Sequence, residues 1–448
     1  MATHAPDPRR IAWQVLLAVE DGAFADAALG AALSGVRLDA RDRGLATLLV
    51  YGTLAWQGLL DHVLKHLGRA AAKLDAPIRV LLRLALFQLV KLDRVPPFAA
   101  VDTAVELSKT VKDGAASGMI NALLRRFLRE GKPLALPHEA DRVAYLALAT
   151  SHPHWLVEHW RSELGDAEAA ALLAADNTPA PTVLRTNTAR ASRERLLAAL
   201  ADAGVAARPT SFAAHGVILE QPTDPTLLPA WRDGWFAIQG EASQLVVALL
   251  GAPPGARVLD VCAAPGGKAL AAAEAVGAAG RVVALDRARG GLRHLRGEAG
   301  RLGVGLATVQ ADATQLPLDP TLRFDAVLVD APCSGLGTLR QHPEIRWRRR
   351  PHDLVALAAL QRALLAAVAA YVRPGGTLVY ATCTIARQEN DAVLEAFLAA
   401  HADFAPDGAT PYLPAAAHAL LDGRGALRTF PHRDGLDGFF AMRLKRSA

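Results

Sequence analysis

Residues 257–268, with the sequence RVLDVCAAPGGK, constrain the fold more than any other stretch of the chain. They open with a short apolar run, which follows Pro254 and Gly255 and is typical of a strand buried on both faces of a parallel sheet. Two glycines and an alanine-rich helical run come next, so a strand leads through a glycine turn into a helix. Such a turn lets the backbone approach a ligand closely, and the helix N-terminus favours polar or anionic groups. The stretch therefore predicts the ligand-binding turn of a doubly wound α/β domain.

The rest of the C-terminal region alternates between strand and helix patterns. The patterns predict strands at 258–262, 281–285, 305–310, 324–329 and 376–382, with helices near 268–276, 288–302, 353–371 and 387–401. Short strands near 426–430 and 438–444 follow. We therefore expect a doubly wound, Rossmann-like α/β sheet with an antiparallel addition at its end.

The chain of 448 residues is too long for one typical domain, and its first part has a different pattern. Residues 9–130 show apolar positions at helical spacing without a strand pattern, and Asp39 is a plausible N-cap, so we expect an all-α bundle. A Gly-Lys-Pro linker starts at Gly131, and a small α+β module follows it. The predicted domains are 1–140, 141–236 and 237–448.

Composition limits the class of protein. The net charge of +5 is mildly basic and permits an RNA partner, and the presence of three cysteines argues against a disulfide framework. The first ten residues lack an apolar signal core, and the sequence shows no run of membrane-spanning length, so we expect a cytoplasmic protein. The histidines of SHPHWLVEH (His152, His154 and His159) have too few companions for a metal site, and no metal is expected.

The glycine turn narrows the choice of cofactor. It is not the GxGxxG of dinucleotide sites, and Ala269 stands where a P-loop needs Ser or Thr. Asp286 and Asp312 follow the next two predicted strands, where acids can bind ribose hydroxyls and an exocyclic amine. S-adenosylmethionine offers both groups and no phosphate, and it is the cofactor we expect. The alternative is that both residues are ordinary acids at strand ends.

Two of the three cysteines follow neighbouring strands at the edge where the cofactor is expected. The fourth strand ends in Asp330-Ala331-Pro332-Cys333, and the fifth leads to Cys383. An amine nitrogen could attack the methyl donor without a thiol, whereas carbon 5 of a pyrimidine needs a thiolate on C6 to become nucleophilic. A second thiol could assist release, and the carboxylate of Asp330 could hold the N3 edge of the base.

These motifs resemble one family. The matching stretches are DVCAAPGGK (260–268), Asp286, Asp312, DAPCSGLGTLR (330–340), HPEIRW (342–347), YATCT (380–384) and DGFF (437–440). Together they resemble the 16S rRNA (cytosine-C5) methyltransferase B family (RsmB/Sun), within the NOL1/NOP2/Sun RNA cytosine-C5 methyltransferases. The N-terminal bundle is similar to the RNA-binding domain of the antitermination factor NusB.

The resemblance implies a role for each matching residue. Cys383 matches the nucleophile that attacks C6, and Cys333 matches the cysteine that helps to release the product, the reverse of the order in DNA cytosine-C5 methyltransferases. Asp330 matches a residue that binds the cofactor and can also touch the cytosine. The implied cofactor-binding residues are Cys262, Ala263, Ala264, Pro265, Gly266, Gly267, Lys268, Asp286, Asp312 and Asp330.

A basic stretch follows the Cys333 motif. Arginines there could bind phosphates and a tryptophan could stack on a base, so we expect RNA contacts from Arg340, Arg346, Trp347 and Arg348. The alternative for this stretch is a solvated loop.

The resemblance implies a 16S rRNA partner, naked or partly assembled into the small subunit. We expect a monomer that engages neither DNA nor membrane. Two alternatives stay open. One is a cytosine-C5 methyltransferase that acts on tRNA or DNA, although the TCT cysteine disfavours DNA. The other is a non-catalytic RNA-binding assembly factor, which the presence of both Cys333 and Cys383 disfavours.

Overall fold

The computed structural model describes residues 7–68, 73–111 and 114–448, which divide into two compact units. The first unit comprises Met1–Pro179 together with Leu339–Arg349, and the second comprises Ala180–Thr338 and Arg350–Ala448. This division differs from the predicted domain limits, because residues 141–179 belong to the first unit and the eleven residues 339–349, which begin at the end of the Cys333 motif, join them. The expected all-helical stretch 9–130 includes residues 69–72 and 112–113, which lie outside the described residues.

The described residues of the first unit form helices joined by loops, without a strand. Its helices are α1 (Pro8–Glu20), α2 (Ala25–Ser34), α3 (Ala40–Ala55), α4 (Gln57–His66), α5 (Ala76–Lys91), α6 (Pro97–Ser108), α7 (Ser117–Arg129), α8 (Arg142–Ala149), α9 (His154–Leu164), α10 (Asp166–Ala175) and α16 (Ile345–Arg348).

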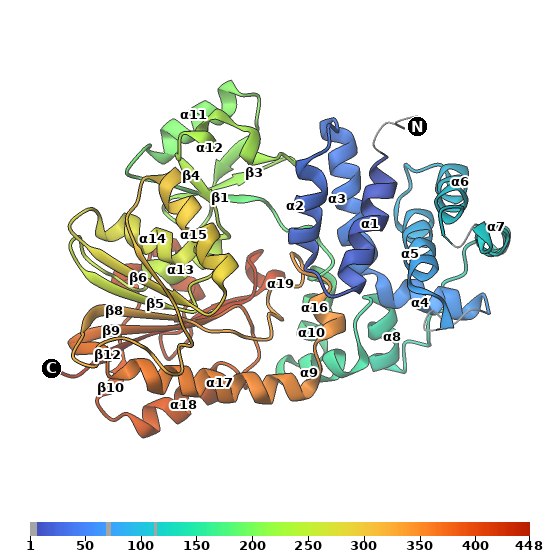
Figure 1. Ribbon diagram of the computed structural model, residues 1–448. Helices are drawn as coiled ribbons and strands as arrows, with labels where there is room; N and C mark the ends of the chain where they lie inside the picture. Colours follow the sequence, from blue (N-terminus) through green and yellow to red (C-terminus); the bar gives the residue numbers. More distant parts are fainter. Residues whose placement is uncertain (1–6, 69–72, 112–113) are drawn as a thin grey trace. The chain divides into compact units, whose positions relative to one another are not determined.

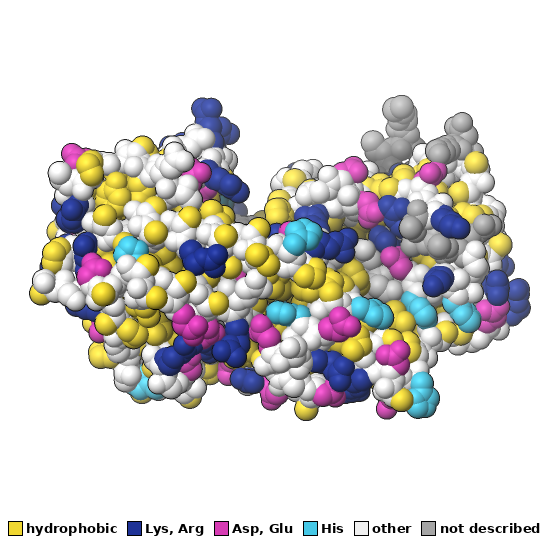
Figure 2. All heavy atoms as spheres, turned by 90° about the horizontal axis from the view of Figure 1, so that it is seen from below, with side chains coloured by type: hydrophobic (Ala, Val, Ile, Leu, Met, Phe, Trp, Pro, Cys, Tyr) yellow, Lys and Arg dark blue, Asp and Glu magenta, His cyan; other side chains and the backbone are white. Residues whose placement is uncertain are grey.

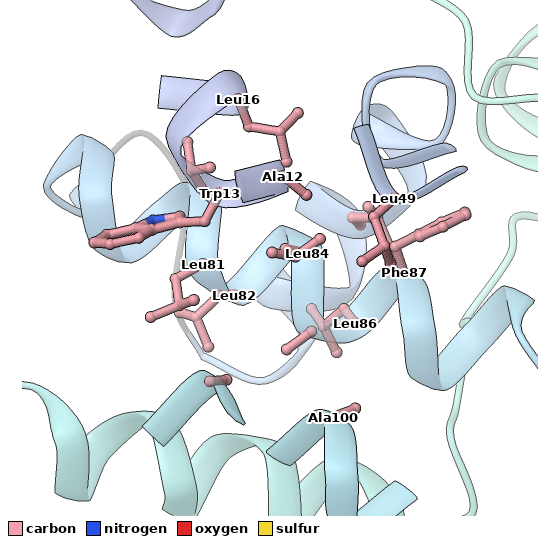
Figure 3. Packing of buried hydrophobic residues seen from close by; sticks show 14 of the residues in the cluster. Ala12, Trp13, Leu16, Leu49, Leu81, Leu82, Leu84, Leu86, Phe87 and Ala100 are labelled. Carbon is pink, nitrogen blue, oxygen red and sulfur yellow. The ribbon is translucent and has the colours of Figure 1, made fainter. Parts of the chain in front are cut away.

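Helix α5 is the centre of the bundle. Its residues from Val80 to Leu86 are almost all buried, which explains why its sequence is apolar on every side. Figure 3 shows leucines of α5 beside Trp13 and Leu16 of α1. Local signals set the helix starts: the side chain of Asp39 accepts a hydrogen bond from the amide of Asp42, so the predicted N-cap is confirmed.

The second unit begins with a small antiparallel sheet in the order β2-β3-β1-β4, which confirms the expected α+β module. The prediction missed β2, a strand of only three residues. The elements are β1 (Val183–Thr186), α11 (Arg193–Asp202), β2 (Ala207–Pro209), β3 (Gly216–Leu219), η3 (Pro225–Leu227), α12 (Pro229–Arg232), β4 (Phe236–Ile238) and α13 (Glu241–Ala248).

The large sheet of the second unit has the order β10-β12-β9-β8-β5-β6-β7, with β11 paired to β12. The five strands from β9 to β7 are parallel, and β12 adds antiparallel to β9, as the sequence predicted. The prediction missed β10. The strands are β5 (Arg257–Val261), β6 (Arg281–Asp286), β7 (Ala307–Gln310), β8 (Phe324–Asp330), β9 (Val372–Thr382), β10 (Phe404–Pro406), β11 (Leu427–Thr429) and β12 (Phe439–Arg446).

Helices cover both faces of this sheet (Figure 1). Helices α13, α14 (Gly267–Val276) and α15 (Arg289–Leu302) lie over one face, and α17 (Pro351–Ala369) and α18 (Asp391–Ala400) lie over the other. Neighbouring strand residues therefore enter different cores, with Val258 facing α14 and Leu259 facing α17. Short turns near η4 (Thr410–Tyr412), η5 (Ala415–Leu420) and α19 (Pro431–Asp434) complete the unit.

Helix α17 is the one described helix whose length and composition would let it cross a membrane. The sequence analysis expected no such run. In the structure, Leu364, Leu365 and Val368 of this helix are buried in the core beneath the sheet. The packing of this buried face accounts for part of its apolar character.

Candidate active site

The parallel strands bring the predicted catalytic and cofactor-binding residues to one edge of the large sheet. Strand β8 ends at Asp330, and β9 runs beside it with Asp330 opposite Ala381. Strand β5 ends just before Cys262, and β6 ends at Asp286. Because the carboxyl ends of parallel strands meet at one edge, residues far apart in the sequence become neighbours there.

The two predicted catalytic cysteines are in contact. The sulfur atoms of Cys333 and Cys383 lie 3.3 Å apart, and both residues are half-buried. The hydrogen bond to Cys383, burial, and the charges of Cys383 and Glu389 together raise the pKa of Cys333 well above its ordinary value. Two thiols this close cannot easily both ionise, so the pair can hold one negative charge and one proton.

A set of buried polar side chains, which the sequence analysis missed, frames both cysteine loops. The carboxylate of Glu389 accepts hydrogen bonds from the amide of Ser334 (2.8 Å) and from the side chain of Gln361 (3.0 Å). The side chain of Gln361 also donates to the carbonyl of Pro332 at 2.9 Å. These bonds hold the loop on both sides of Cys333.

The Cys383 loop is held by Asn390, the residue that follows Glu389 in the chain. The side-chain amide of Asn390 donates to the carbonyl of Thr384 at 2.9 Å, and its oxygen accepts from the hydroxyl of Thr382 at 2.6 Å. The sequence signal for this frame is the polar QEN stretch at 388–390. Its last two residues, Glu389 and Asn390, are fully buried.

Two glycines bring a third loop into the site. Gly438 of the DGFF motif donates its amide to the carbonyl of Gly337 at 2.7 Å, and Gly337 donates to the carbonyl of Cys383 at 3.0 Å. A Cβ atom on Gly337 would lie 1.9 Å from the carbonyl oxygen of Gly438, so a side chain cannot be accommodated there.

Lys268 and Asp330 form an ion pair beside the cysteines. The Lys268 ammonium donates to Asp330 at 2.8 Å and lies 5.2 Å from the ring centroid of Phe439. Burial opposes the charge on Lys268, but the nearby negative groups Asp330, Cys383 and Asp260 raise its pKa. The glycine turn thus aims a cation at the edge of the sheet where Cys383 lies.

The predicted cofactor residues line the same edge. The carboxylate of Asp286 accepts the amides of Ala264 and Ala288 at 2.9 and 2.7 Å, which fixes it between the glycine turn and α15. Gly266 has a φ of 120°, and a Cβ atom there would lie 2.4 Å from Leu295, so the turn packs too closely for another residue. Two fixed carboxylate lone pairs and an open helix N-terminus suit a ribose and a zwitterionic amino acid, the two ends of S-adenosylmethionine.

The remaining predicted positions differ in their surroundings. Asp312 is exposed, and hydrogen bonds from the amide and hydroxyl of Thr314 lower its pKa. Cys262 is largely buried, and burial followed by the charges of Asp286, Asp260 and Asp330 raises its pKa. Cys262 is therefore a protonated thiol that packs as a small apolar side chain.

Asp260, one residue before the end of β5, is a further acid that the sequence analysis did not single out. It is almost fully buried, and neither of its carboxylate oxygens has a hydrogen-bond partner among the described residues. Burial and the nearby charges of Asp330 and Asp286 raise its pKa well above the ordinary value, against the opposing effect of Lys268. The site therefore contains a carboxyl group that favours the neutral form.

The basic stretch after the Cys333 motif gives a different result from the one expected. Arg346 is fully buried in the first unit, where its guanidinium donates to the carbonyls of Ala55, Ser151 and Asp176 at 3.2–3.3 Å and to the side chain of Asn177 at 2.8 Å. Burial lowers the pKa of Arg346 to about 10, although Asp176 opposes the shift. Arg346 is therefore inaccessible to RNA in this structure, contrary to the expectation, because its side chain is fully buried and its two terminal nitrogens donate to protein oxygens.

Three residues close to Arg346 in the chain, Glu344, Trp347 and Arg348, also form hydrogen bonds with the helices of the first unit. The indole of Trp347 donates to the carbonyl of Leu54 at 3.0 Å, and Arg348 donates to the carbonyls of Val19 and Ala23 at 2.8 and 2.6 Å. Glu344 accepts the amide of Ala25 at the start of α2 at 3.0 Å. Residues 344–348 thus satisfy the free backbone groups at the ends of α1, α2, α3 and α10, where helix dipoles favour these charges. RNA contacts by Arg340, Trp347 and Arg348 stay a prediction.

Among the described residues, no group of three or more His, Cys, Asp or Glu side chains is arranged to hold a metal ion.

Comparison with known families agrees with this geometry. Residues 247–445 match the family model of the 16S rRNA methyltransferase RsmB/F, residues 6–129 match the NusB family, and residues 152–226 match the ferredoxin-like domain of RsmF/B-like methyltransferases. The chain is 35% identical to the "Probable ribosomal RNA small subunit methyltransferase B" of Bacillus subtilis over 98% of each sequence. The chain belongs to the ribosomal RNA small subunit methyltransferase B family.

Other members and structures extend this result. The ribosomal RNA small subunit methyltransferase B of Pseudomonas putida is 37% identical over 88% of this chain and 89% of its own. The crystal structure of PH0851 matches 99% of both chains with a TM-score of 0.86 and 26% identity. The chain is therefore an rRNA methyltransferase that uses S-adenosylmethionine, with a helical NusB domain and a Rossmann-like catalytic domain.

Proposed function

We propose that this protein methylates carbon 5 of a cytosine in 16S rRNA through a covalent bond between Cys383 and carbon 6 of the base. One observation carries the proposal: two thiols lie 3.3 Å apart at the ends of adjacent parallel strands, beside a lysine–aspartate pair. A methyl transfer to nitrogen or oxygen needs no thiol, whereas transfer to carbon 5 of a pyrimidine needs one to make that carbon nucleophilic.

The roles of the residues follow from their positions. The Cys383 thiolate forms a bond to C6, and the electron pair of the C5–C6 double bond moves to C5. The glycine turn and Asp286 would hold S-adenosylmethionine, which would supply an electrophilic methyl group; the C5 electron pair would form the new C–C bond as the S–CH3 bond breaks and S-adenosylhomocysteine leaves. Once C5 carries this methyl group, a base removes the C5 proton, the double bond re-forms, and Cys383 leaves as a thiolate.

Asp330 and Cys333 complete the site in this proposal. Asp330 is held by Lys268 at 2.8 Å and would bind the N3 and N4 edge of the cytosine. Cys333 is in contact with Cys383 and would assist its departure. The target cytosine must be unpaired or flipped out, because both C5 and C6 have to be reached.

The variants Cys383→Ala and Cys333→Ala test this assignment. Cys383→Ala should abolish methyl transfer and form no adduct, because nothing attacks C6. Cys333→Ala should still attack and methylate but release slowly, so a protein–RNA adduct should accumulate as a shifted band on a denaturing gel. The opposite pattern would exchange the two roles, and activity without an adduct in both variants would exclude the covalent mechanism.

The choice of 16S rRNA is tested separately. Bisulfite sequencing of small-subunit RNA from cells with and without the protein should show one cytosine that loses its modification. A modified tRNA in place of rRNA would support the alternative substrate, and an RNA-binding protein with no methylated product would support the non-catalytic alternative. We further propose that the protein acts in the cytoplasm as a monomer, on RNA that is naked or partly assembled.

A further inference from the structure

The loops that carry the two cysteines differ in the charged group that stands nearest to each. Glu389 lies on the Cys333 side: it is fully buried and accepts the amide of Ser334, the residue after Cys333, at 2.8 Å. Lys268 lies on the other side: it interacts electrostatically with Cys383 and is paired with Asp330 at 2.8 Å. One thiol thus faces a carboxylate and the other faces an ammonium group.

We propose that Glu389 is a positioning residue that keeps the proton of the cysteine pair on Cys333, so that Cys383 alone is the thiolate that attacks the base. This inference rests on the proposed function, and it explains why two chemically identical thiols in contact have different roles. The frame around Glu389 is rigid, because Gln361 bonds both to its carboxylate and to the carbonyl of Pro332.

The electrostatic argument follows from the short distance between the sulfurs. Two negative charges 3.3 Å apart in a partly buried site repel strongly, so the two thiols cannot both ionise and at least one proton stays on the pair. The carboxylate of Glu389 disfavours a negative charge on Cys333, which leaves Cys383 as the thiol that can lose its proton.

Other titratable groups also face the cysteine pair. The buried phenol of Tyr380 donates its hydroxyl to the Glu389 carbonyl at 2.6 Å, and the acids Asp330 and Asp260 lie near Lys268. Burial raises the pKa of Glu389, while the hydrogen bonds from Ser334 and other donors oppose this shift and favour the carboxylate. The bonds that fix the loop thus partly offset the effect of burial on the Glu389 carboxylate.

The variant Glu389→Gln separates charge from shape. A glutamine has the same size, and its amide oxygen can still accept the Ser334 amide, but the negative charge is gone. The measurement is the rate of alkylation of each cysteine by iodoacetamide as a function of pH, followed by mass spectrometry of the peptides. It needs no RNA, so it can fail while the methylation itself stands.

The expected result is a shift of the Cys333 alkylation midpoint to lower pH by about one unit, a tenfold rise in its thiolate fraction below that midpoint. The comparison should also be made in the Cys383→Ala background, where Cys333 has no neighbouring thiolate and only the charge of residue 389 differs. Cys262 is an internal control, since unchanged labelling of this third cysteine shows that the fold has not opened. An unchanged Cys333 midpoint in both backgrounds would overturn the proposal.

A second inference comes from the arginines of α15. Arg289, Arg293 and Arg296 are exposed, and in the part of the chain that the structure describes no carboxylate forms an ion pair with any of them. Their spacing of four and three residues puts them on one face of the helix, which we call the α15 face. The guanidinium of Arg296 also donates to the hydroxyl of Thr308 at 3.1 Å, which leaves most of its donors open.

The positive charge at the start of the α15 face is the opposite of the charge usually found at a helix N-terminus. The first turn of α15 has no acidic residue, and Arg289 is its first residue, where the helix dipole disfavours a cation. On the opposite face of the large sheet, which Figure 2 shows from below, basic and acidic side chains are intermingled. A row of three exposed guanidinium groups therefore offers ready partners for an anionic surface.

We infer that the α15 face binds the phosphate backbone of the rRNA substrate, an interaction that rests on the proposed function. Helix α15 starts three residues after Asp286, so the face begins at the edge of the sheet that contains the cysteines. RNA bound there would have its backbone beside the site that receives the target base. Arginine is suited to phosphate because its planar donors match two phosphate oxygens at once.

The test is the salt dependence of binding to an rRNA fragment that the wild-type protein methylates. Replacing Arg289, Arg293 and Arg296 together by Ala should weaken binding and reduce the slope of log affinity against log salt by about one for each phosphate that is no longer bound. S-adenosylmethionine affinity should not change. The matched control is Arg362→Ala, since Arg362 is an exposed arginine on α17 at the other face, to be compared with Arg293→Ala. An unchanged slope in the triple variant, or an equal change in the control, would overturn the inference.

Discussion

Arg346 and Arg293 both lie a short way beyond the end of a strand that contributes to the site, but Arg346 is buried and Arg293 is exposed. Arg346 follows β8 and its cysteine loop, and it donates four hydrogen bonds inside the helical unit. Arg293 follows β6 and is exposed without an ion pair among the described residues. In sequence the first is the more obvious RNA contact, because a tryptophan and three further arginines accompany it.

The difference is set by what surrounds each arginine. The stretch 344–348 meets the ends of several helices, whose last carbonyls have no partner within the helix and attract cations. Within the described residues, the arginines of the α15 face are exposed and form no ion pair with a carboxylate. An arginine next to an active site is therefore a candidate for RNA binding only when the fold leaves its donors open.

The largest difference between the two arginines is expected when Arg346 is replaced by Leu. The change leaves the carbonyls of Ala55, Ser151 and Asp176 without a donor in a buried region, so the free energy of unfolding of the helical unit should fall by about 3–5 kcal/mol. Chemical denaturation followed by circular dichroism measures the loss. An effect as small as that of Arg293→Leu would mean that the buried hydrogen bonds contribute little.

Acid should weaken the region around Arg346 through His152. Burial, followed by the charge of Arg346, lowers the pKa of His152 well below its ordinary value, although a bond to Thr150 opposes the shift. Below about pH 6.5 the unfolded chain binds a proton at this residue and the folded chain does not, so stability should fall by up to ~1.4 kcal/mol per pH unit. Denaturation midpoints between neutral and mildly acid pH measure the slope, and His152→Gln should flatten it. A slope that is equally steep in this variant would assign the effect to another group.

Trp347→Phe should have an intermediate effect on the free energy of unfolding. The ring stays apolar, but the hydrogen bond from the indole to the carbonyl of Leu54 disappears, which should cost about 1 kcal/mol. The same denaturation experiment applies. If Trp347 instead stacks on a base, RNA affinity will fall while stability stays at the wild-type value.

The smallest effect on stability is expected for the α15 face. Single replacements of Arg289, Arg293 or Arg296 by Ala should change the free energy of unfolding by no more than about 0.5 kcal/mol, because these side chains are exposed and form no ion pair in the described part of the chain. Thermal and chemical unfolding of the three variants check this. A loss comparable to that of Arg346→Leu would show that the α15 face has a structural partner after all.

Much of the catalytic half could be predicted because its signals are local. A buried apolar run, a glycine turn and an alanine-rich helix define β5 and α14 within about twenty residues, and Asp286, Cys333 and Cys383 mark strand ends. Strand order then brings these residues to one edge. The short strands β2 and β10 were missed because each spans three residues and ends in a proline, which argues against a strand.

The burial of Glu389 and Arg346 could not be predicted from local sequence. A glutamate in a polar stretch suggests solvent, and an arginine beside a tryptophan suggests nucleic acid, but both residues are fully buried with hydrogen bonds to loops or helices distant in sequence. The same holds for the assignment of residues 339–349 to the helical unit, which no local pattern indicates.

The sequence by itself determined the order of strands and helices, the glycine turn and the identity of the two cysteines, because each depends on neighbours along the chain and on side-chain periodicity. The tertiary structure alone decided which charged side chains face solvent and which satisfy buried backbone groups. Burial removes water from a charge, so its partners come from whichever loops and helix ends the fold brings to it, and these lie dozens to hundreds of residues away. The contact between Cys333 and Cys383, fifty residues apart, is the same kind of result.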